Sequence, residues 1–141
     1  MGREEHLIGI IRETPLALAL IDDQTEEMCI AAVIRDAWAI VFVKNQTIFV
    51  CKIAIKTNPH VLQFITHQTK ELCEEAVKRD GKTLIYVHDQ TYRICMAAIR
   101  GKMFDNAYEI IKMIRDRAMR NHIAHMYDHN RAIKISPLLV K

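Results

Sequence analysis

The chain repeats itself every 22 residues, and this period limits the folds that it can adopt. A Gln-Thr pair recurs with its threonine at Thr25, Thr47, Thr69 and Thr91, and a cysteine follows four residues after each threonine. The shared pattern is Q-T-x-x-x-C-x-x-A-[VI], and four copies follow one another without an insertion. Such regularity indicates a stack of equivalent structural units. We number the positions of a unit from its threonine.

Each unit carries signals for two short helices. The threonine is a favoured N-cap residue, and the apolar residues at positions 4, 5, 8 and 9 form one face of a helix. Position 12 holds another N-cap residue, and proline follows it in two units. The four residues at this position are Thr14, Asp36, Asn58 and Asp80. We therefore expect a second helix there, both helices of a unit being about 8 to 10 residues long. The alternative is a pair of β-strands over 37–43 and 83–87, where β-branched and aromatic residues are frequent.

These units predict one all-α domain over residues 1–141, a solenoid-like array of about five helix-turn-helix repeats that ends in a longer C-terminal capping helix. The repeats are expected at 3–24, 25–46, 47–68, 69–90 and 91–112, with the capping helix and a tail in 113–141. Residues 100–102 have the composition of a helix stop. One helix is expected from Asn106 to about Met126, capped by Asp105 and ended near Asp128. The tail beyond it is expected to fold back over the open end of the stack.

The repeated motif resembles a known family. Residues 25–34, 47–56, 69–78 and 91–100, together with a trailing L-x-[FY]-[VI] as in residues 84–87, resemble a short tandem repeat of unknown function. That repeat occurs in arrays in proteins of large DNA viruses, phages and some bacteria. The resemblance covers roughly residues 14–100 and implies an α-helical array and a viral origin. It transfers no catalytic residue, so a role particular to this chain is expected in the residues after 100.

The four cysteines, Cys29, Cys51, Cys73 and Cys95, share one position of the unit. Equivalent positions of stacked helices lie about 9 to 10 Å apart, whereas disulfide-bonded cysteines need Cα atoms within about 7 Å. The sequence contains no CxxC pair that would begin a zinc site. We expect buried, free thiols in a reducing compartment.

Basic residues gather near the C-terminus. Residues 3–24 carry two basic and five acidic side chains, whereas residues 113–141 carry six basic and two acidic ones. The side chains of Lys112, Arg115, Arg117 and Arg120 are therefore the candidate binding residues. They could contact phosphates, but basic residues are also favoured at a solvated helix C-terminus.

Three histidines, His122, His125 and His129, follow at spacings that place them on one helix face. They are an alternative metal site for zinc or nickel, although the general-base glutamate of an HExxH motif is missing. Motifs for nucleophilic, phosphate-binding or dinucleotide-binding chemistry are absent from the sequence. We therefore expect no enzyme activity and no cofactor.

Architecture favours a module that binds another protein, with a host factor as the partner if the viral resemblance holds. A nucleic-acid-associated protein acting through the C-terminal basic helix is the second hypothesis, and a self-assembling structural protein, a homo-oligomer stacked end to end, is the third. The longest apolar run is 37–43, too short for the roughly 20 residues of a membrane span. We expect a cytoplasmic protein without a membrane partner.

Overall fold

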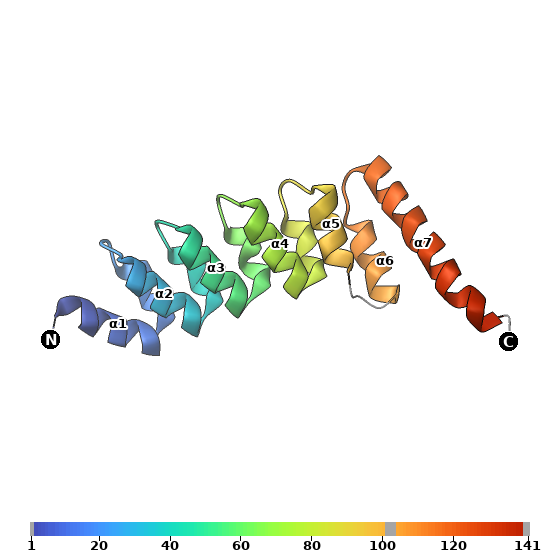
Figure 1. The fold of residues 1–141 in the computed structure, drawn as a ribbon. Coiled ribbons are helices and arrows are strands. Elements are labelled where there is room, and N and C mark those ends of the chain that lie inside the picture. The colour runs from blue at the N-terminus through green and yellow to red at the C-terminus, as the bar shows by residue number, and fades with distance from the viewer. Residues whose placement is uncertain (1, 101–103, 140–141) are drawn as a thin grey trace.

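A computed structural model describes residues 2–100 and 104–139. For residues 104, 105 and 131–139 it describes the backbone only. The chain is all-helical, and its described residues contain no strand. Figure 1 shows the helices standing side by side in an elongated array, with the two termini at opposite ends. The all-α prediction is confirmed. The strand alternative is wrong, because 37–42 and 81–86 are helical.

An α-helix forms the first half of each unit, where the sequence predicted one. These helices are α1 (Arg3–Glu13), α2 (Glu26–Arg35), α3 (Ile48–Thr57), α4 (Lys70–Arg79) and α5 (Tyr92–Ile99). In α2 to α5 the threonine at position 1 caps the helix, because its hydroxyl oxygen accepts the backbone N–H three residues later at 3.3 Å. The unit of α1 has Arg3 at this position and no side-chain cap.

The second helix of a unit is a 3-10 helix of six residues, shorter than predicted. The four are η1 (Pro15–Leu20), η2 (Ala37–Phe42), η3 (Pro59–Phe64) and η4 (Gly81–Tyr86). Asp36, Asn58 and Asp80 cap η2 to η4 as expected, each accepting the N–H two residues later at 3.0 Å, whereas Thr14 makes no such bond. A 3-10 helix rises about 2.0 Å per residue, so six residues span about 12 Å. The second half of a 22-residue unit is short, and the steep rise of the 3-10 helix lets the chain run the length of the unit and reach the start of the next α-helix.

The core lies between the layer of α-helices and the layer of 3-10 helices. It contains the apolar residues at positions 4, 5, 8 and 9 of α2 to α5, all less than about a tenth exposed. The alanines at position 8, namely Ala32, Ala54, Ala76 and Ala98, are fully buried. A methyl side chain at this position lets successive α-helices approach closely, and this explains the recurring alanine.

The recurring glutamine at position 22 joins neighbouring units. Gln68 Nε2 donates to Leu62 O of its own unit at 3.1 Å and to Tyr86 O of the next unit at 2.9 Å. Its Oε1 accepts the N–H of His88, also in the next unit, at 3.0 Å. Gln46 and Gln24 make the corresponding three bonds one and two units earlier. The glutamines therefore form a row of amides that joins consecutive 3-10 helices, a role that the sequence analysis did not assign.

The C-terminal region differs from the predicted single helix. It forms α6 (Phe104–Lys112) and α7 (Arg117–Leu139). The break has two causes: Gln90 binds Met113 O and the N–H of Arg115, and Asp116 caps α7 by accepting the N–H of Met119 at 2.7 Å. The predicted cap at Asp105 is wrong, because α6 begins at Phe104 and Asp105 lies inside the helix.

The end of α7 also differs from the prediction. The helix does not stop near Asp128 but continues to Leu139, since no residue between Asp128 and Pro137 breaks it. The expected tail is therefore the last part of α7 and does not fold back as a separate segment up to Leu139. Residues 101–103 of the predicted helix stop, and residues 140–141, lie outside the described residues.

Helix α7 covers the last units, as expected of a cap. Ile123 is buried, Tyr127 packs edge-on against Tyr108 of α6 with ring centroids 5.6 Å apart, and the Tyr108 hydroxyl donates to Asp128. Tyr92 of α5 donates to the sulfur of Met126 at 3.8 Å. The C-terminal end of the stack is thus covered by α6 and α7, while α1 forms the opposite end (Figure 1).

Candidate binding surface

Arg115 is part of the repeat architecture and is not a free cation. Its guanidinium donates from Nη2 to Val87 O at 2.5 Å and to His88 O at 2.8 Å. The backbone N–H of Arg115 is bound to Gln90 Oε1 at 2.9 Å. The side chain therefore satisfies carbonyl groups at the end of the fourth unit, and these bonds would have to break before it could bind a phosphate.

Arg120 is held in the same way, because its Nη1 donates to Ile114 O at 2.9 Å and its side chain is half-buried. Lys112, at the end of α6, and Arg117, at the start of α7, are exposed. Two of the four predicted basic residues, Arg115 and Arg120, therefore have guanidinium groups bonded to carbonyl oxygens, and Arg115 is exposed like Lys112 and Arg117. The structure does not assemble them into one phosphate-binding group.

The three histidines lie on α7, as predicted, and all are exposed. His122 packs against the ring of Tyr92 with centroids 6.3 Å apart. Among the described residues no group of three or more His, Cys, Asp or Glu side chains could hold a metal ion. The alternative metal site at His122, His125 and His129 is therefore not formed in this structure.

The cysteines are buried and free, as the repeat predicted. Burial raises the pKa of the thiols of Cys51, Cys73 and Cys95 to about 11. Burial, with a smaller contribution from Glu26, also raises the pKa of Cys29. A thiol with a raised pKa carries little of the reactive thiolate at neutral pH, so these side chains act as small core residues.

An apolar stripe runs along the outside of the 3-10 layer. In a 3-10 helix residues three apart lie on the same face, so positions 14 and 17 point outward together while positions 15 and 16 are buried in η2 to η4. We define the stripe as six side chains at positions 14, 17 and 18 that are between 39 and 86% exposed. They are Leu16, Leu20, Trp38, Val41, Phe64 and Ile85.

Side chains of neighbouring units touch along this stripe. Trp38 at position 14 packs edge-on against Phe64 at position 18 of the next unit, with ring centroids 5.5 Å apart. His60 and Tyr86 repeat the contact one unit later at 5.9 Å. The first contact joins the stripe between the second and third units, and the second joins the outward side chains of the third and fourth units. Trp38 and Phe64 are restrained by their contact, so these two side chains lose little rotamer freedom if a partner covers them.

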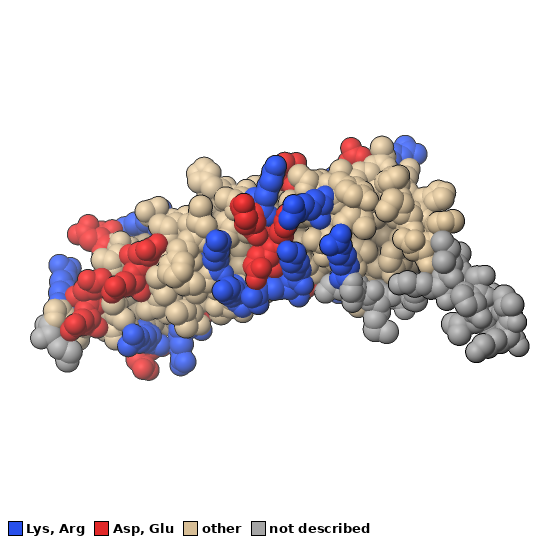
Figure 2. Space-filling model, in the orientation of Figure 1, with Lys and Arg blue, Asp and Glu red and all other residues tan. Residues whose placement is uncertain are grey.

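The layer of α-helices is mostly charged, and its charges pair within the layer. Arg93 of α5 lies 2.8 Å from Glu74 of α4, and Arg79 lies 2.8 Å from Glu75. Figure 2 shows basic and acidic side chains intermixed over the middle of the array. Exposed apolar side chains of this layer include Ile34 and Phe49, which lie on the neighbouring helices α2 and α3. Ile48 of α3 is exposed as well, whereas the next exposed large apolar side chain of this layer after Phe49 is Tyr92 on α5, beyond the charged helix α4.

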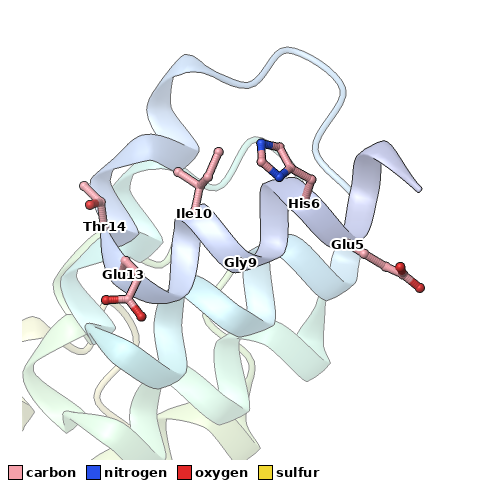
Figure 3. A pocket seen from close by; sticks show the side chains of 6 residues that line it. All are labelled: Glu5, His6, Gly9, Ile10, Glu13 and Thr14. Atoms are coloured by element: carbon pink, nitrogen blue, oxygen red, sulfur yellow. The ribbon is translucent and has the colours of Figure 1, made fainter. Parts of the chain in front are cut away.

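The outer side of α1 forms a second open surface, which we call the end face. A shallow hollow there is lined by Glu5, His6, Gly9, Ile10, Glu13 and Thr14 (Figure 3). A Cβ atom added to Gly9 would have no neighbour within 4 Å, and Ile10 is 42% exposed. In the next four units the residue equivalent to Ile10 is a fully buried alanine.

Comparisons with known proteins leave the class of this chain open. A scan against models of protein families found no match, and searches of curated proteins and of solved structures found none either. The resemblance to a viral and bacterial tandem repeat therefore stays a prediction. In the part of the chain that the structure describes, no helix is both long enough and apolar enough to cross a membrane.

Proposed function

We propose that the chain is a non-enzymatic protein-protein interaction module that binds an apolar segment of a partner protein along the stripe of the 3-10 layer. The observation that carries the proposal is that each of the four 3-10 helices exposes at least one large apolar side chain at position 14, 17 or 18, although His60, Gln63 and Lys82 occupy some of these positions in the third and fourth units. Contiguous exposed apolar surface on a soluble domain is typical of interaction sites. Aromatic side chains such as Trp38 and Phe64 are also frequent among residues that dominate binding energy.

The nucleic-acid hypothesis has less support. Arg115 and Arg120 bind backbone carbonyl groups, and the remaining cations, Lys112 and Arg117, lie on different helices. Nucleic-acid affinity grows with the number of phosphates contacted by basic side chains. Of the four candidate side chains, only Lys112 and Arg117 are left for phosphates, and two cations are few for specific binding. We therefore infer that the partner is a protein.

Two triple variants with the same charge change would test this function. The first, Leu16→Glu, Val41→Glu and Ile85→Glu, places three carboxylates in the stripe. The second, Ile34→Glu, Phe49→Glu and Ile48→Glu, places three in the α-layer, where the side chains are similarly exposed. Unmodified protein and both variants would be used to capture proteins from cells that express the chain, after nuclease treatment and with quantitative mass spectrometry.

We expect a partner that the unmodified protein and the α-layer variant both retain and that the stripe variant loses at least tenfold. Circular dichroism would verify that all three proteins have the same helicity. Equal capture by the two variants would refute the stripe as the binding surface. Loss of all partners after nuclease treatment would instead favour the nucleic-acid hypothesis.

A further inference from the structure

The junctions between units show what kind of surface the end face matches. Each internal junction brings positions 6 and 10 of one α-helix against positions 3 and 7 of the next. The groove between α4 and α5, for example, is lined by Glu74 and Lys78 at positions 6 and 10 and by Arg93 and Ala97 at positions 3 and 7. The groove between α1 and α2 has the same arrangement.

Side chains at these facing positions are complementary: they are either oppositely charged or both apolar. Between α4 and α5, Glu74 pairs with Arg93 at 2.8 Å. Between α3 and α4, Lys52 faces Glu71: the backbone N–H of Glu71 and the Thr69 hydroxyl lower the pKa of this carboxyl most, and Lys52 lowers it further. Between α2 and α3 the facing positions are apolar, with Ile30 and Ile53 packed against the core. The character at positions 3 and 7 therefore matches the side chains of the preceding helix.

On α1 the corresponding positions carry Glu5 at position 3, Gly9 at position 7 and Glu13 at position 11. Figure 3 shows Glu5 and Glu13 extending from one side of the helix, with His6 and Ile10 on the other. Both glutamates are exposed, and no ion pair joins either of them to a described residue. Position 11 of the following helix also lines a junction, as Arg35 of α2 does beside Arg12 and Glu13 of α1. A helix that packs against Glu5 at position 3 and Glu13 at position 11 therefore carries basic residues four apart, as α3 does with Lys52 and Lys56 at its positions 6 and 10.

Backbone groups at the same end also lack their usual partner. In the four following units the glutamine of the preceding unit binds a carbonyl at the end of the second helix and an N–H two residues later. In the first unit the equivalent groups are Leu20 O and the N–H of Asp22. No side chain in the described part of the chain occupies them, and Leu20 is 86% exposed. An incoming amide side chain would find the same acceptor and donor that Gln24 finds one unit later.

We infer that the end face is a docking site for a helical unit of a partner protein, one that carries two basic residues four apart against Glu5 and Glu13 and an amide side chain for Leu20 O and Asp22 N–H. The opposite end of the array is covered by α6 and α7, so docking takes place at one end only. This inference rests on the charges of α1 and not on the stripe of the 3-10 layer. The two surfaces share only Leu20, whose side chain belongs to the stripe and whose backbone carbonyl belongs to the end face.

A peptide with this chemistry is available from the chain itself. The probe is a synthetic peptide with the sequence of residues 47–68, with Ile48, Phe49 and Cys51 replaced by Ser, Ser and Ala to keep it soluble. It retains Lys52, Lys56 and the terminal Gln68. The control peptide has Lys52→Glu and Lys56→Glu in addition. Each is titrated into the ¹⁵N-labelled full chain and followed by amide chemical shifts.

We expect concentration-dependent shifts confined to α1 and to residues 20–22, and binding of the control peptide about 3- to 10-fold weaker, as expected for two exposed ion pairs. The variant Glu5→Lys, Glu13→Lys should reverse this preference. A matched variant with the same charge change, Asp89→Lys and Glu109→Lys, should leave it unchanged, because both residues are exposed and lie on other units.

Several results would overturn the inference. These are the absence of shifts at millimolar peptide, shifts centred on the stripe, and equal binding of the two peptides. If the free protein shows the same shifts on concentration and sediments as a dimer, the end face binds a second copy and the inferred partner is wrong. Circular dichroism of the Glu5→Lys, Glu13→Lys variant checks that its fold is kept, which the exposure of both side chains predicts.

Discussion

Replacing Gln68 by alanine should reveal how strongly the amide row holds neighbouring units together. The change removes three hydrogen bonds to backbone groups, two to carbonyl oxygens and one from an N–H, at 2.9 to 3.1 Å. Each such bond contributes about 0.5 to 1.5 kcal/mol net. Because the side chain is half-buried, water can replace part of what is lost. We therefore expect the free energy of unfolding to fall by about 2 to 3 kcal/mol.

The measurement is urea denaturation followed by circular dichroism, with Gln63→Ala as the matched control. Gln63 lies on η3 in the same unit, is exposed, and makes one hydrogen bond, from Nε2 to His60 O at 3.1 Å. Its replacement should cost about 0.5 kcal/mol or less. Because repeat arrays can unfold in parts, hydrogen exchange of the His88 amide gives a local readout, and this amide should exchange faster in Gln68→Ala.

The variant Gln68→Glu adds a test of sign. A carboxylate would face Leu62 O and Tyr86 O, which both need a donor. The folded state therefore favours the protonated acid, and its pKa in the folded protein lies above that in the unfolded chain. The stability is fully present below the unfolded pKa of about 4.3 and is lost as pH rises through the folded pKa. Two results together would show that the amide row does not hold the units together. They are equal free energies of unfolding for Gln68→Ala and Gln63→Ala, and a free energy of unfolding of Gln68→Glu that does not change with pH.

Three further results are expected. The four cysteines should react with a thiol reagent only in denaturant, because they are buried and their pKa is raised; rapid labelling of the native protein would contradict this. Gly81→Ala should lower the free energy of unfolding by about 1 to 3 kcal/mol, because the added Cβ would lie 2.4 Å from Ala98 O and 2.5 Å from Ile110 Cδ1. The control Gly9→Ala lies on a helix with no atom within 4 Å of the added Cβ, so it should be neutral or stabilising in the same melt. Arg115→Gln should lower the melting temperature more than Arg117→Gln, because Arg115 alone of the two binds Val87 O and His88 O, and equal melting would mean that those bonds contribute little.

The period of the sequence was enough to predict the helices of the first half of each unit and the residues that face the core. Cys51 and Ala54 are buried where the repeat placed them, and Thr47 and Asn58 cap the helices that they were expected to cap. These features are local: a cap bonds to an N–H two or three residues away, and a helix face follows from spacing. A single sequence therefore contains the information needed to find them.

The candidate sites were predicted less well, because charge along a sequence does not show what a side chain binds. Arg115 and Arg120 were grouped with Lys112 and Arg117 as basic residues, yet two of the four bind carbonyl oxygens. The role of Gln68 was also missed, although a polar residue recurring at one position was a signal for it. One of its partners, Leu62 O, lies 6 residues away in the same unit, whereas Tyr86 O lies 18 residues away in the next unit and comes close only because the units stack.

Taken alone, the sequence determined that this protein is built of repeated helical units with alanine and cysteine inside, since those properties depend on spacing and on short-range hydrogen bonds. Tertiary structure decided the 3-10 form of the second helices, the break between α6 and α7, and which surfaces stay open. Each of these depends on contacts between units: Gln90 interrupts the last helices by binding Met113 O and the N–H of Arg115. The stripe and the end face are open because no other described part of the array packs over them, and this is a property of the whole stack rather than of any one repeat.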